Sequence, residues 1–329
     1  MSYAPHRRVA LEAVLRACGL CQTVQKRLVA DSVLEKGDKS PVTVADFGAQ
    51  AVVSHLLGRA FPDIPLVGEE DASALRDPDH AALRGEVVSA VQSVLDGCSE
   101  ADVLDAIDRG TYEGGSEGLH FTLDPIDGTK GFLRLEQYAV ALALIEDGEV
   151  VLGVLGCPQL PLDASDETGD VGCIFVAVRG EGAFMRTLDD PTERSVKVGR
   201  ATHPEELRLC ESVEKAHTDQ SQAAQVAGLL GVARPPYRMD SQCKYAAVAR
   251  GDATVYLRLP TRADYVEKIW DHAAGWAVVT EAGGTVTDCQ GEPLDFSCGR
   301  RLERNRGVIA THGPLHAQVV RAVQQVLEG

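Results

Sequence analysis

The chain has 329 residues, of which 44% are hydrophobic and 25% are charged, which is close to the average for globular proteins and unlike a disordered chain. Its formal net charge of −17 disfavours binding to a nucleic-acid polymer or an anionic membrane surface, because like charges repel. The longest wholly apolar stretch, residues 138–145, is far shorter than the roughly 20 residues that a membrane span needs.

The cysteines and the N-terminus bear on the compartment. Nine cysteines are an odd number for a disulfide-stapled secreted domain, and no zinc-binding motif accompanies them. The first residues lack the apolar core and the cleavage site of a signal peptide. We therefore expect the protein in the cytoplasm, or in a chloroplast or mitochondrion after removal of a presequence.

Helical periodicity marks the first part of the chain. Apolar residues recur at helical spacing over residues 9–34 and again over 49–57, where the second helix ends before Pro62. Between the two, residues 36–41 (KGDKSP) contain the glycine and proline that end a helix. From residue 72 to 118 the pattern is weak and charged, which indicates short surface helices.

Strand-like sequence begins at Phe121. The runs that suit strands cover residues 121–124, 138–145, 150–156 and 173–178. Asp147-Gly148 is a favourable two-residue turn for a hairpin between the second run and the third. This part of the chain therefore predicts an antiparallel sheet with helices packed on it.

Strands and helices alternate beyond about residue 200. Helices are expected over residues 219–230, 241–250 and 268–282 and from Leu315 onward. Such alternation is typical of an α/β lobe with a partly parallel sheet. We therefore expect an N-terminal α+β lobe over residues 1–200, a C-terminal α/β lobe over residues 201–329, and a cleft between them.

The segment from Asp124 to Thr129 (DPIDGT) joins the first predicted strand to a turn. Pro125 restricts the backbone and Gly128 permits a sharp reversal, so that both aspartates can point to one place. Two carboxylates and an exposed carbonyl suit a hard cation such as Mg²⁺. The same residue types also make ordinary surface turns, so the segment alone leaves both interpretations open.

Further acidic residues occur near predicted strand and helix ends. Glu69 is the first of three acidic residues that follow the apolar stretch IPLV after Gly68, at the mouth of a predicted core strand. Asp46 lies at the start of the second helix, where helix capping is the alternative to a catalytic role. Asp271 opens another predicted helix, and the adjacent His272 is expected to be a packed or capping residue rather than a ligand.

The order of these acidic segments carries a family resemblance. Asp46, Glu69-Glu70, DPIDGT and a later WDHAAG segment together resemble the lithium-sensitive, magnesium-dependent phosphomonoesterases, which include inositol monophosphatase and fructose-1,6-bisphosphatase. The ordered set is far more specific than any one motif. The resemblance implies a layered αβαβα sugar-phosphatase fold with two lobes and an active-site cleft between them.

Within this superfamily the chain resembles the 3'(2'),5'-bisphosphate nucleotidases, and among them the plant-type enzymes. The resemblance extends over essentially the whole chain. It rests on residues 39–46, 127–134, 239–245, 255–260 and 265–271. A generic inositol monophosphatase would usually have Asn in place of Lys130-Gly131.

The resemblance implies a role for each matching residue. The implied ligands of two or three Mg²⁺ ions are Glu69, Asp124, the Ile126 carbonyl, Asp127 and Asp271. The residues that would hold and deprotonate the attacking water are Asp46 and Thr129. Those that would contact the nucleotide are Thr129, His217, Ser241, Lys244, Arg258 and Asp271. Lys244 and Arg258 match the need for positive charge at the second phosphate of the substrate.

The implied reaction is the metal-assisted hydrolysis of 3'-phosphoadenosine 5'-phosphate to AMP and phosphate. The sulfated analogue and the 2'-phosphate isomer are further implied substrates, and inhibition by lithium follows from the resemblance alone. The expected partner is thus a small nucleotide, bound by a monomer or a weak homodimer. An inositol phosphatase and a catalytically idle nucleotide sensor are the alternatives, and the intact acidic residues count against the second.

Cys157 and Cys173 flank a polar loop between two predicted adjacent strands. Strand ends of this kind bring two Cβ atoms toward disulfide range. The plant-type relatives that the chain resembles place cysteines similarly. The pair is either a redox switch that restrains the loop and lowers activity on oxidation, or two packed free thiols.

Overall fold

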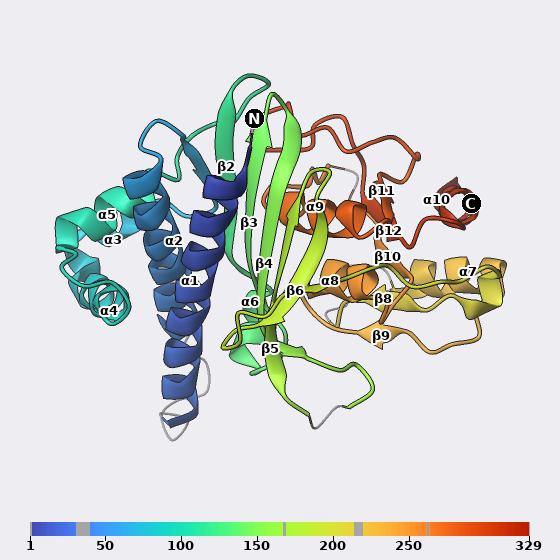
Figure 1. The fold of residues 1–329 in the computed structure, drawn as a ribbon, viewed down its shortest axis with the longest axis horizontal. Helices are drawn as coiled ribbons and strands as arrows, with labels where there is room; N and C mark the ends of the chain where they lie inside the picture. The colour runs from blue at the N-terminus through green and yellow to red at the C-terminus, as the bar shows by residue number, and fades with distance from the viewer. Residues whose placement is uncertain are drawn as a thin grey trace.

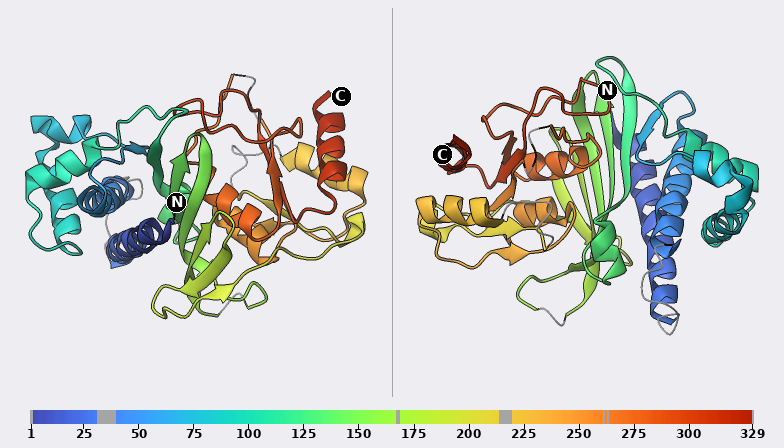
Figure 2. Two further views of the ribbon diagram at one scale, coloured as in Figure 1. Left: turned by 45° about the horizontal axis from the view of Figure 1, so that its top comes forward. Right: turned by 180° about the vertical axis from the view of Figure 1, so that it is seen from behind.

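The computed structural model describes residues 2–30, 40–166, 169–213, 220–260, 262 and 264–328. These residues form alternating layers of helices, sheet, helices, sheet and helices (Figure 1). Figure 2 shows the same order from behind, with the N-terminal helices toward one side and the C-terminal helix at the other. The predicted αβαβα fold is confirmed.

The larger sheet contains strands in chain order. Within the described residues it runs from β1 to β7, and all neighbours pair antiparallel except β1 and β2, which are parallel. The strands are β1 Leu66–Gly68, β2 Leu119–Asp127, β3 Ala139–Glu146, β4 Glu149–Pro161, β5 Val171–Val178, β6 Gly182–Thr187 and β7 Arg194–Ser195. Asp147 and Gly148, with φ angles of 52° and 81°, form the predicted turn between β3 and β4.

The smaller sheet mixes parallel and antiparallel pairs. Its order is β11-β12-β10-β8-β9 in the described part of the chain, with β8 parallel to both β9 and β10. The strands are β8 Leu209–Glu211, β9 Tyr237–Arg238, β10 Val255–Arg258, β11 Thr285–Thr287 and β12 Val308–Thr311. The predicted partly parallel sheet is therefore confirmed. The division of the chain into lobes at residue 200 lies between the two sheets and stays a prediction.

Helices fill the layers on either side of each sheet. They are α1 Ala4–Ala30, α2 Ser40–Ala60, α3 Ser73–Arg76, α4 Ala81–Gln92, α5 Glu100–Asp108, α6 Thr129–Leu133, α7 Gln220–Leu230, α8 Cys243–Arg250, α9 Ala273–Glu281 and α10 His316–Glu328. Helices α1 and α2 cover one face of the larger sheet, α8 and α9 lie between the sheets, and α7 and α10 cover the far face of the smaller sheet. Among the described helices, none is long and apolar enough to cross a membrane.

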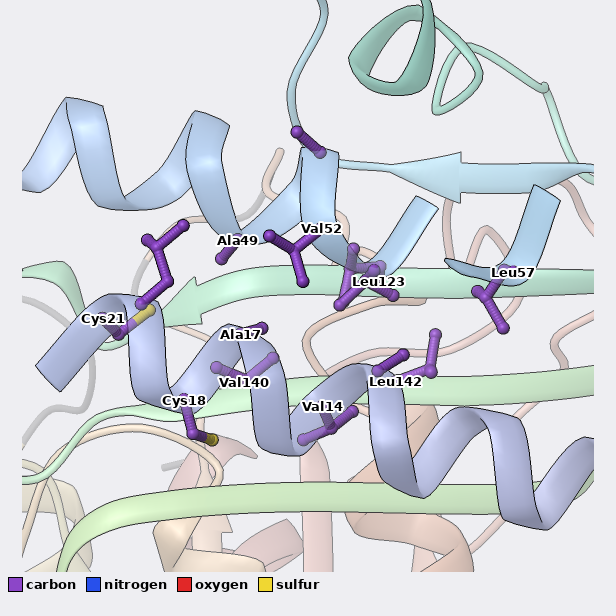
Figure 3. Packing of buried hydrophobic residues seen from close by; sticks show 14 of the residues in the cluster. Val14, Ala17, Cys18, Cys21, Ala49, Val52, Leu57, Leu123, Val140 and Leu142 are labelled. Atoms are coloured by element: carbon purple, nitrogen blue, oxygen red, sulfur yellow. The ribbon is translucent and has the colours of Figure 1, made fainter. Parts of the chain in front are cut away.

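Buried apolar side chains fix the outer helices against the larger sheet. Val14 of α1 and Val52 of α2 share a core with Val140 and Leu142 of β3 (Figure 3). Each of these side chains is fully buried. Because burial stabilises by roughly 25 cal/mol per Å² of apolar surface, this core holds α2, and with it Asp46, at a fixed place beside the sheet.

Two glycines of β4 set how closely the neighbouring helices approach. A Cβ atom on Gly156 would lie 2.3 Å from the Cys18 sulfur of α1. A Cβ atom on Gly153 would lie 2.7 Å from the Cβ of Ala277 of α9. Residues three apart on a strand point to opposite faces, so the two glycines serve the two helix layers. A side chain at either position would push a layer away from the sheet.

The starts of the first two helices differ from the prediction. Helix α1 begins at Ala4 rather than at residue 9, and α2 begins at Ser40, so that Pro41 is inside it. Proline is tolerated in the first turn of a helix, because the amide hydrogens there have no acceptor within the helix. Asp46 is therefore in the second turn of α2 and is not a capping residue. The expected end of the first helix at residue 34 lies outside the described residues.

The predicted helix over residues 268–282 was wrong in its first part, since α9 begins at Ala273. Lys268 instead forms a bridge with Arg301, and the Ile269 N–H donates to the Arg300 carbonyl at 3.2 Å. These contacts with residues 300 and 301 engage backbone hydrogen-bonding groups that a helix over residues 268–272 would need for its own hydrogen bonds. Asp271 consequently stands in the turn before α9.

Gly156→Ala should destabilise the protein by about 1–3 kcal/mol, because the added methyl group would overlap Cys18 in a packed core. Urea unfolding followed by circular dichroism measures the change. Gly85→Ala in α4 is the matched control: no described atom lies within 4 Å of its added Cβ, and the substitution should be neutral or slightly stabilising. Equal stability of Gly156→Ala and the wild type would contradict this account of the packing.

Candidate active site

The parallel pairing of β1 and β2 brings the first two acidic segments together. Gly68, the last residue of β1, is paired with Leu123 of β2. Glu69 directly follows β1, and Asp124 is the next residue on β2, so the parallel pairing carries both toward the same edge of the sheet. Residues 55 positions apart in the chain, 124 − 69, thus become neighbours.

A bulge near the end of β2 orients its two aspartates. Asp124 is paired with Ala141 of β3 and Asp127 with Ala139, so three steps on β2 match two on β3. Residues three apart on a regular strand point to opposite faces, and one extra residue returns them to the same face. Gly128, at a φ of 91°, then turns the chain into α6. The predicted corner is therefore present.

These strand ends open onto a cavity of about 680 Å³, whose walls also come from α6, α8, β10 and the turn before α9. The sequence-predicted residues that line it are Glu69, Asp124, Ile126, Asp127, Thr129, Ser241, Lys244, Arg258 and Asp271. The structure thus brings every implied metal ligand into the same cavity. His217 lies outside the described residues.

The clustered carboxylates perturb one another's pKa values. Burial, followed by repulsion from Glu69 and Asp127, raises the pKa of Asp124 well above its usual range. Burial also raises the pKa of Asp271 to about 7. The Glu69 side chain is exposed to the cavity. Desolvation by the surrounding cavity wall, and then repulsion from the charge of Glu70, raise its pKa to about 7. Like charges so confined favour a compensating cation.

Asp124 gives the clearest sign that the cluster fits a cation. Asp124 is 3% exposed, and its Oδ1 atom has no hydrogen-bond partner among the described residues. A buried carboxylate oxygen without a donor is costly unless a positive charge neutralises it. Carboxylate and carbonyl oxygens are the ligands that hard cations prefer, so the residues present fit Mg²⁺.

Lys244 and Arg258 add positive charge to the same cavity. Lys244 is 3% exposed, and its Nζ lies 5.3 Å from the centre of the Tyr256 ring. Burial lowers the pKa of Lys244, and Asp127 opposes this shift. Arg258 Nε donates to Glu267 at 3.3 Å, and this carboxylate raises the pKa of Arg258 against the effect of burial. Both side chains thus offer N–H donors for an anion.

Asp46 lies beside the cluster, although it forms no part of the described cavity lining. Burial, then the charges of Glu70 and Glu69, raise its pKa well above the usual range. Gln50, one turn further along α2, accepts from the Glu70 N–H at 3.0 Å and donates to the Glu70 carbonyl at 2.5 Å. This contact fixes α2 to the end of β1. Thr129, in contrast, is exposed at the start of α6 in the cavity wall.

The prediction from sequence missed several residues of the cavity wall. They are Lys130, Asp240, Gln242, Tyr256, Arg262, Tyr265 and Glu267. All but Arg262 lie within the segments that carry the family resemblance, and this proximity was the available signal. His272 is buried and also lines the cavity: its Nδ1 lies 2.7 Å from the Tyr245 hydroxyl and its Nε2 3.1 Å from Glu267. The expectation that it is not a ligand stays a prediction.

Cys157 and Cys173 occupy directly opposite positions on β4 and β5. Both thiols are free and fully buried. Burial raises the pKa of Cys173 to about 12 and that of Cys157 well above its usual range. Opposite residues on antiparallel strands have Cβ atoms about 4.5–5.5 Å apart, slightly more than a disulfide requires.

Comparison with known proteins gives consistent matches. The sequence pattern of the inositol monophosphatase family matches residues 4–328. A 3'(2'),5'-bisphosphate nucleotidase of Schizosaccharomyces pombe is 44% identical over 99% of this chain and 97% of its own length. The 3'(2'),5'-bisphosphate nucleotidase 1 of Arabidopsis thaliana is 46% identical over 98% of this chain and 97% of its own length.

Solved structures agree on the fold. An inositol monophosphatase from Zymomonas mobilis matches with a TM-score of 0.65 at 17% identity, over 98% of this chain and 99% of its own. The inositol monophosphatase from Anabaena matches with a TM-score of 0.62 at 21% identity, over 97% and 94% of the two chains. The family resemblance read from the acidic motifs is confirmed, and the chain belongs to the inositol monophosphatase family.

Proposed function

We propose that the protein removes the 3'-phosphate of 3'-phosphoadenosine 5'-phosphate and releases AMP and phosphate. The observation that carries this proposal is the meeting of a carboxylate cluster with Lys244 and Arg258 in one cavity. A bisphosphorylated nucleotide needs both, because one phosphate is cleaved and the other must be held. The names of the relatives at 44% and 46% identity support a 3',5'-bisphosphate nucleotide and its 2'-isomer as substrates. The adenine base and the sulfated analogue are part of the proposal through the family resemblance alone.

Membership in a metal-dependent phosphatase family supports a metal centre in this cavity. The residues proposed to hold two or three Mg²⁺ ions are Glu69, Asp124, Ile126 through its carbonyl, Asp127 and Asp271. When bound, Mg²⁺ supplies the charge that activates water and neutralises the leaving oxygen. Inhibition by lithium, which the family resemblance implies, is part of the proposal.

The chain's own residues would position and activate the water. The Thr129 hydroxyl and the Asp46 carboxylate are proposed to hold it in line with the phosphorus–oxygen bond that breaks. Asp46 would accept the proton, and its raised pKa makes it a stronger base than an exposed carboxylate. Because water is the nucleophile, the reaction needs no covalent phosphoenzyme.

The retained phosphate and the nucleoside would be held by the other side of the cavity. Lys244 and Arg258 are proposed to bind the phosphate, because charge-assisted N–H donors suit its oxygens. Ser241, His217, Thr129 and Asp271 are the further proposed contacts. We expect the lobes 1–200 and 201–329 to enclose this small substrate in a monomer or a weak homodimer.

Phosphate release from 3'-phosphoadenosine 5'-phosphate, measured beside inositol 1,4-bisphosphate, tests the proposal. With Mg²⁺ we expect kcat/KM to be at least about a hundredfold higher for the nucleotide. Both compounds carry a second phosphate, but the two differ in the spacing between their phosphates, and we expect only the nucleotide to place its second phosphate at Lys244 and Arg258, where charged contacts are worth about 3 kcal/mol. Chelation of Mg²⁺ or addition of lithium should abolish the activity. Preference for inositol 1,4-bisphosphate would favour the inositol phosphatase, and hydrolysis of neither compound would favour the nucleotide sensor.

Lys244→Met should lower kcat/KM for 3'-phosphoadenosine 5'-phosphate by about 10- to 100-fold, because a charge-assisted hydrogen bond worth about 1.5–3 kcal/mol is lost. Slow hydrolysis of adenosine 3'-monophosphate, which lacks the second phosphate, should change little. Lys197→Met removes the same charge from the exposed surface outside the cavity and should leave both rates unchanged. An equal loss for both substrates would contradict the proposed role of Lys244.

We also propose that Cys157 and Cys173 form a disulfide under oxidising conditions and that this lowers activity. Their opposite positions on β4 and β5 support the pairing. Cys157 also interacts with Cys243 of α8, which lies between cavity-lining residues in the sequence. A crosslink between the strands would therefore disturb the packing directly behind the cavity wall.

Oxidation of this pair should be slow at neutral pH and should accelerate roughly tenfold per pH unit in the mildly alkaline range, because the raised pKa of both thiols leaves little thiolate. Alkylation followed by mass spectrometry gives the extent of oxidation, and the phosphate assay gives the activity. Cys157→Ser should resist inactivation, whereas Cys298→Ser should behave like the wild type. Activity that falls while both thiols still react would contradict the switch.

A further inference from the structure

Gln242 connects the segments that supply Asp127 and Asp271. It is 2% exposed, precedes α8 and lines the cavity. Its backbone N–H donates to Asp127 Oδ2 at 2.6 Å. Its side chain donates from Nε2 to the Trp270 carbonyl at 2.8 Å and accepts from the Gly275 N–H at 3.0 Å. The two side-chain contacts lie on either side of Asp271 in the sequence.

The contact with Gly275 completes the N-terminus of α9. His272 is the N-cap residue of this helix, but its side chain makes no capping hydrogen bond in the described structure. Its ring nitrogens instead face the Tyr245 hydroxyl and Glu267. The N–H groups of a first helical turn have no acceptor within the helix, so the Gly275 N–H needs one from elsewhere. Gln242 supplies it from the turn that precedes α8.

The chemistry of this position calls for a carboxamide. The Trp270 carbonyl needs a donor and the Gly275 N–H needs an acceptor, and the two ends of one glutamine side chain provide both. An ionised glutamate has no donor, and an apolar side chain has neither group. Because the position is buried, backbone groups deprived of Gln242 would lose hydrogen bonds that water replaces poorly.

The contact with Asp127 depends on the tight turn before α8. Ser241 has a φ of 66°, which is rare for a residue with a side chain. A Cβ atom on Gly128, at the end of β2, would lie 2.8 Å from the Ser241 Cβ. The absence of a side chain at Gly128 therefore lets the start of α8 approach β2. This approach places the Gln242 N–H at the Asp127 carboxylate.

We propose that Gln242 is a positioning residue that fixes Asp127 and Asp271 relative to each other and thereby sets the affinity of the site for Mg²⁺. The inference rests on the proposed function, of which the metal centre is part. Asp127 ends a strand of the larger sheet, whereas Asp271 precedes a helix of the middle layer. Their like charges push the two segments apart, and Gln242 is hydrogen-bonded to both. Loss of its carboxamide would let the Asp271 turn shift while the cores of both layers remain.

Titration calorimetry of Mg²⁺ with Gln242→Met tests this role. Methionine is close to glutamine in size but cannot make either side-chain hydrogen bond, and we expect the Kd for Mg²⁺ to rise at least about tenfold. Asn305→Leu is the matched control. The Asn305 amide also bridges backbone groups, accepting from the Asp295 N–H at 2.7 Å and donating to the Pro293 carbonyl at 2.9 Å, but outside the cavity lining. Its Kd for Mg²⁺ should equal that of the wild type.

The Tm of each variant without Mg²⁺ separates a loss of stability from a loss of metal affinity. An unchanged Kd in Gln242→Met, with a Tm lowered as in Asn305→Leu, would overturn the inference and leave the metal centre intact. No Mg²⁺ binding by the wild type, or binding that survives Asp124→Asn, would overturn the metal centre itself. Should Gln242→Met fail to fold, Gln242→Asn, whose amide is one methylene shorter, replaces it; a raised Kd is expected again, and an unchanged Kd overturns the inference.

Discussion

Mutual repulsion among enclosed carboxylates is the constraint on which the rest of the structure depends. Glu69, Asp124, Asp127 and Asp271 line one cavity, and burial with neighbouring negative charge raises the pKa of Asp124 well above its usual range. Groups of like charge stay together only when the fold holds them or a cation neutralises them. Hydrogen bonds around the cavity hold the segments in place, and the Asp124 Oδ1 atom, which has no partner among the described residues, favours a cation.

Separate layers anchor the acidic segments, and a few side chains join those layers at the cavity. Arg300 donates to the Gly68 carbonyl at 2.6 Å, and its guanidinium lies 4.9 Å from the centre of the Trp270 ring. It thus ties the end of β1 to the residue before Asp271. Gln242 is hydrogen-bonded to the same segment through the Trp270 carbonyl and to the end of β2 through Asp127. The close packing of helices on both faces of β4 fixes the distance between these layers. The geometry of the site is therefore a property of the whole fold.

Much of this fold could be predicted from residues that are neighbours in the sequence. The predictions that failed depended on contacts between residues far apart in the sequence. The turn at Asp147 follows from two adjacent residues, and the acidic residues of the cavity were identified because their order along the chain is specific. The helix expected to contain Asp271 starts later, because Lys268 pairs with the distant Arg301. Gln242 was overlooked because its partners lie on β2, before α9 and on α9, and its residue type does not reveal them. Sequence thus identifies groups that carry charge more readily than groups that hold them in place.

Diffraction from crystals grown with Mn²⁺ in place of Mg²⁺ would test most directly whether the carboxylate cluster is a metal centre. Mn²⁺ accepts the same oxygen ligands, and its anomalous scattering locates it without reference to the expected site. We predict anomalous peaks within coordination distance of Asp124 and Asp127, and their loss from crystals of Asp124→Asn. Peaks confined to other parts of the protein, or none at a Mn²⁺ concentration that supports hydrolysis, would contradict this assignment.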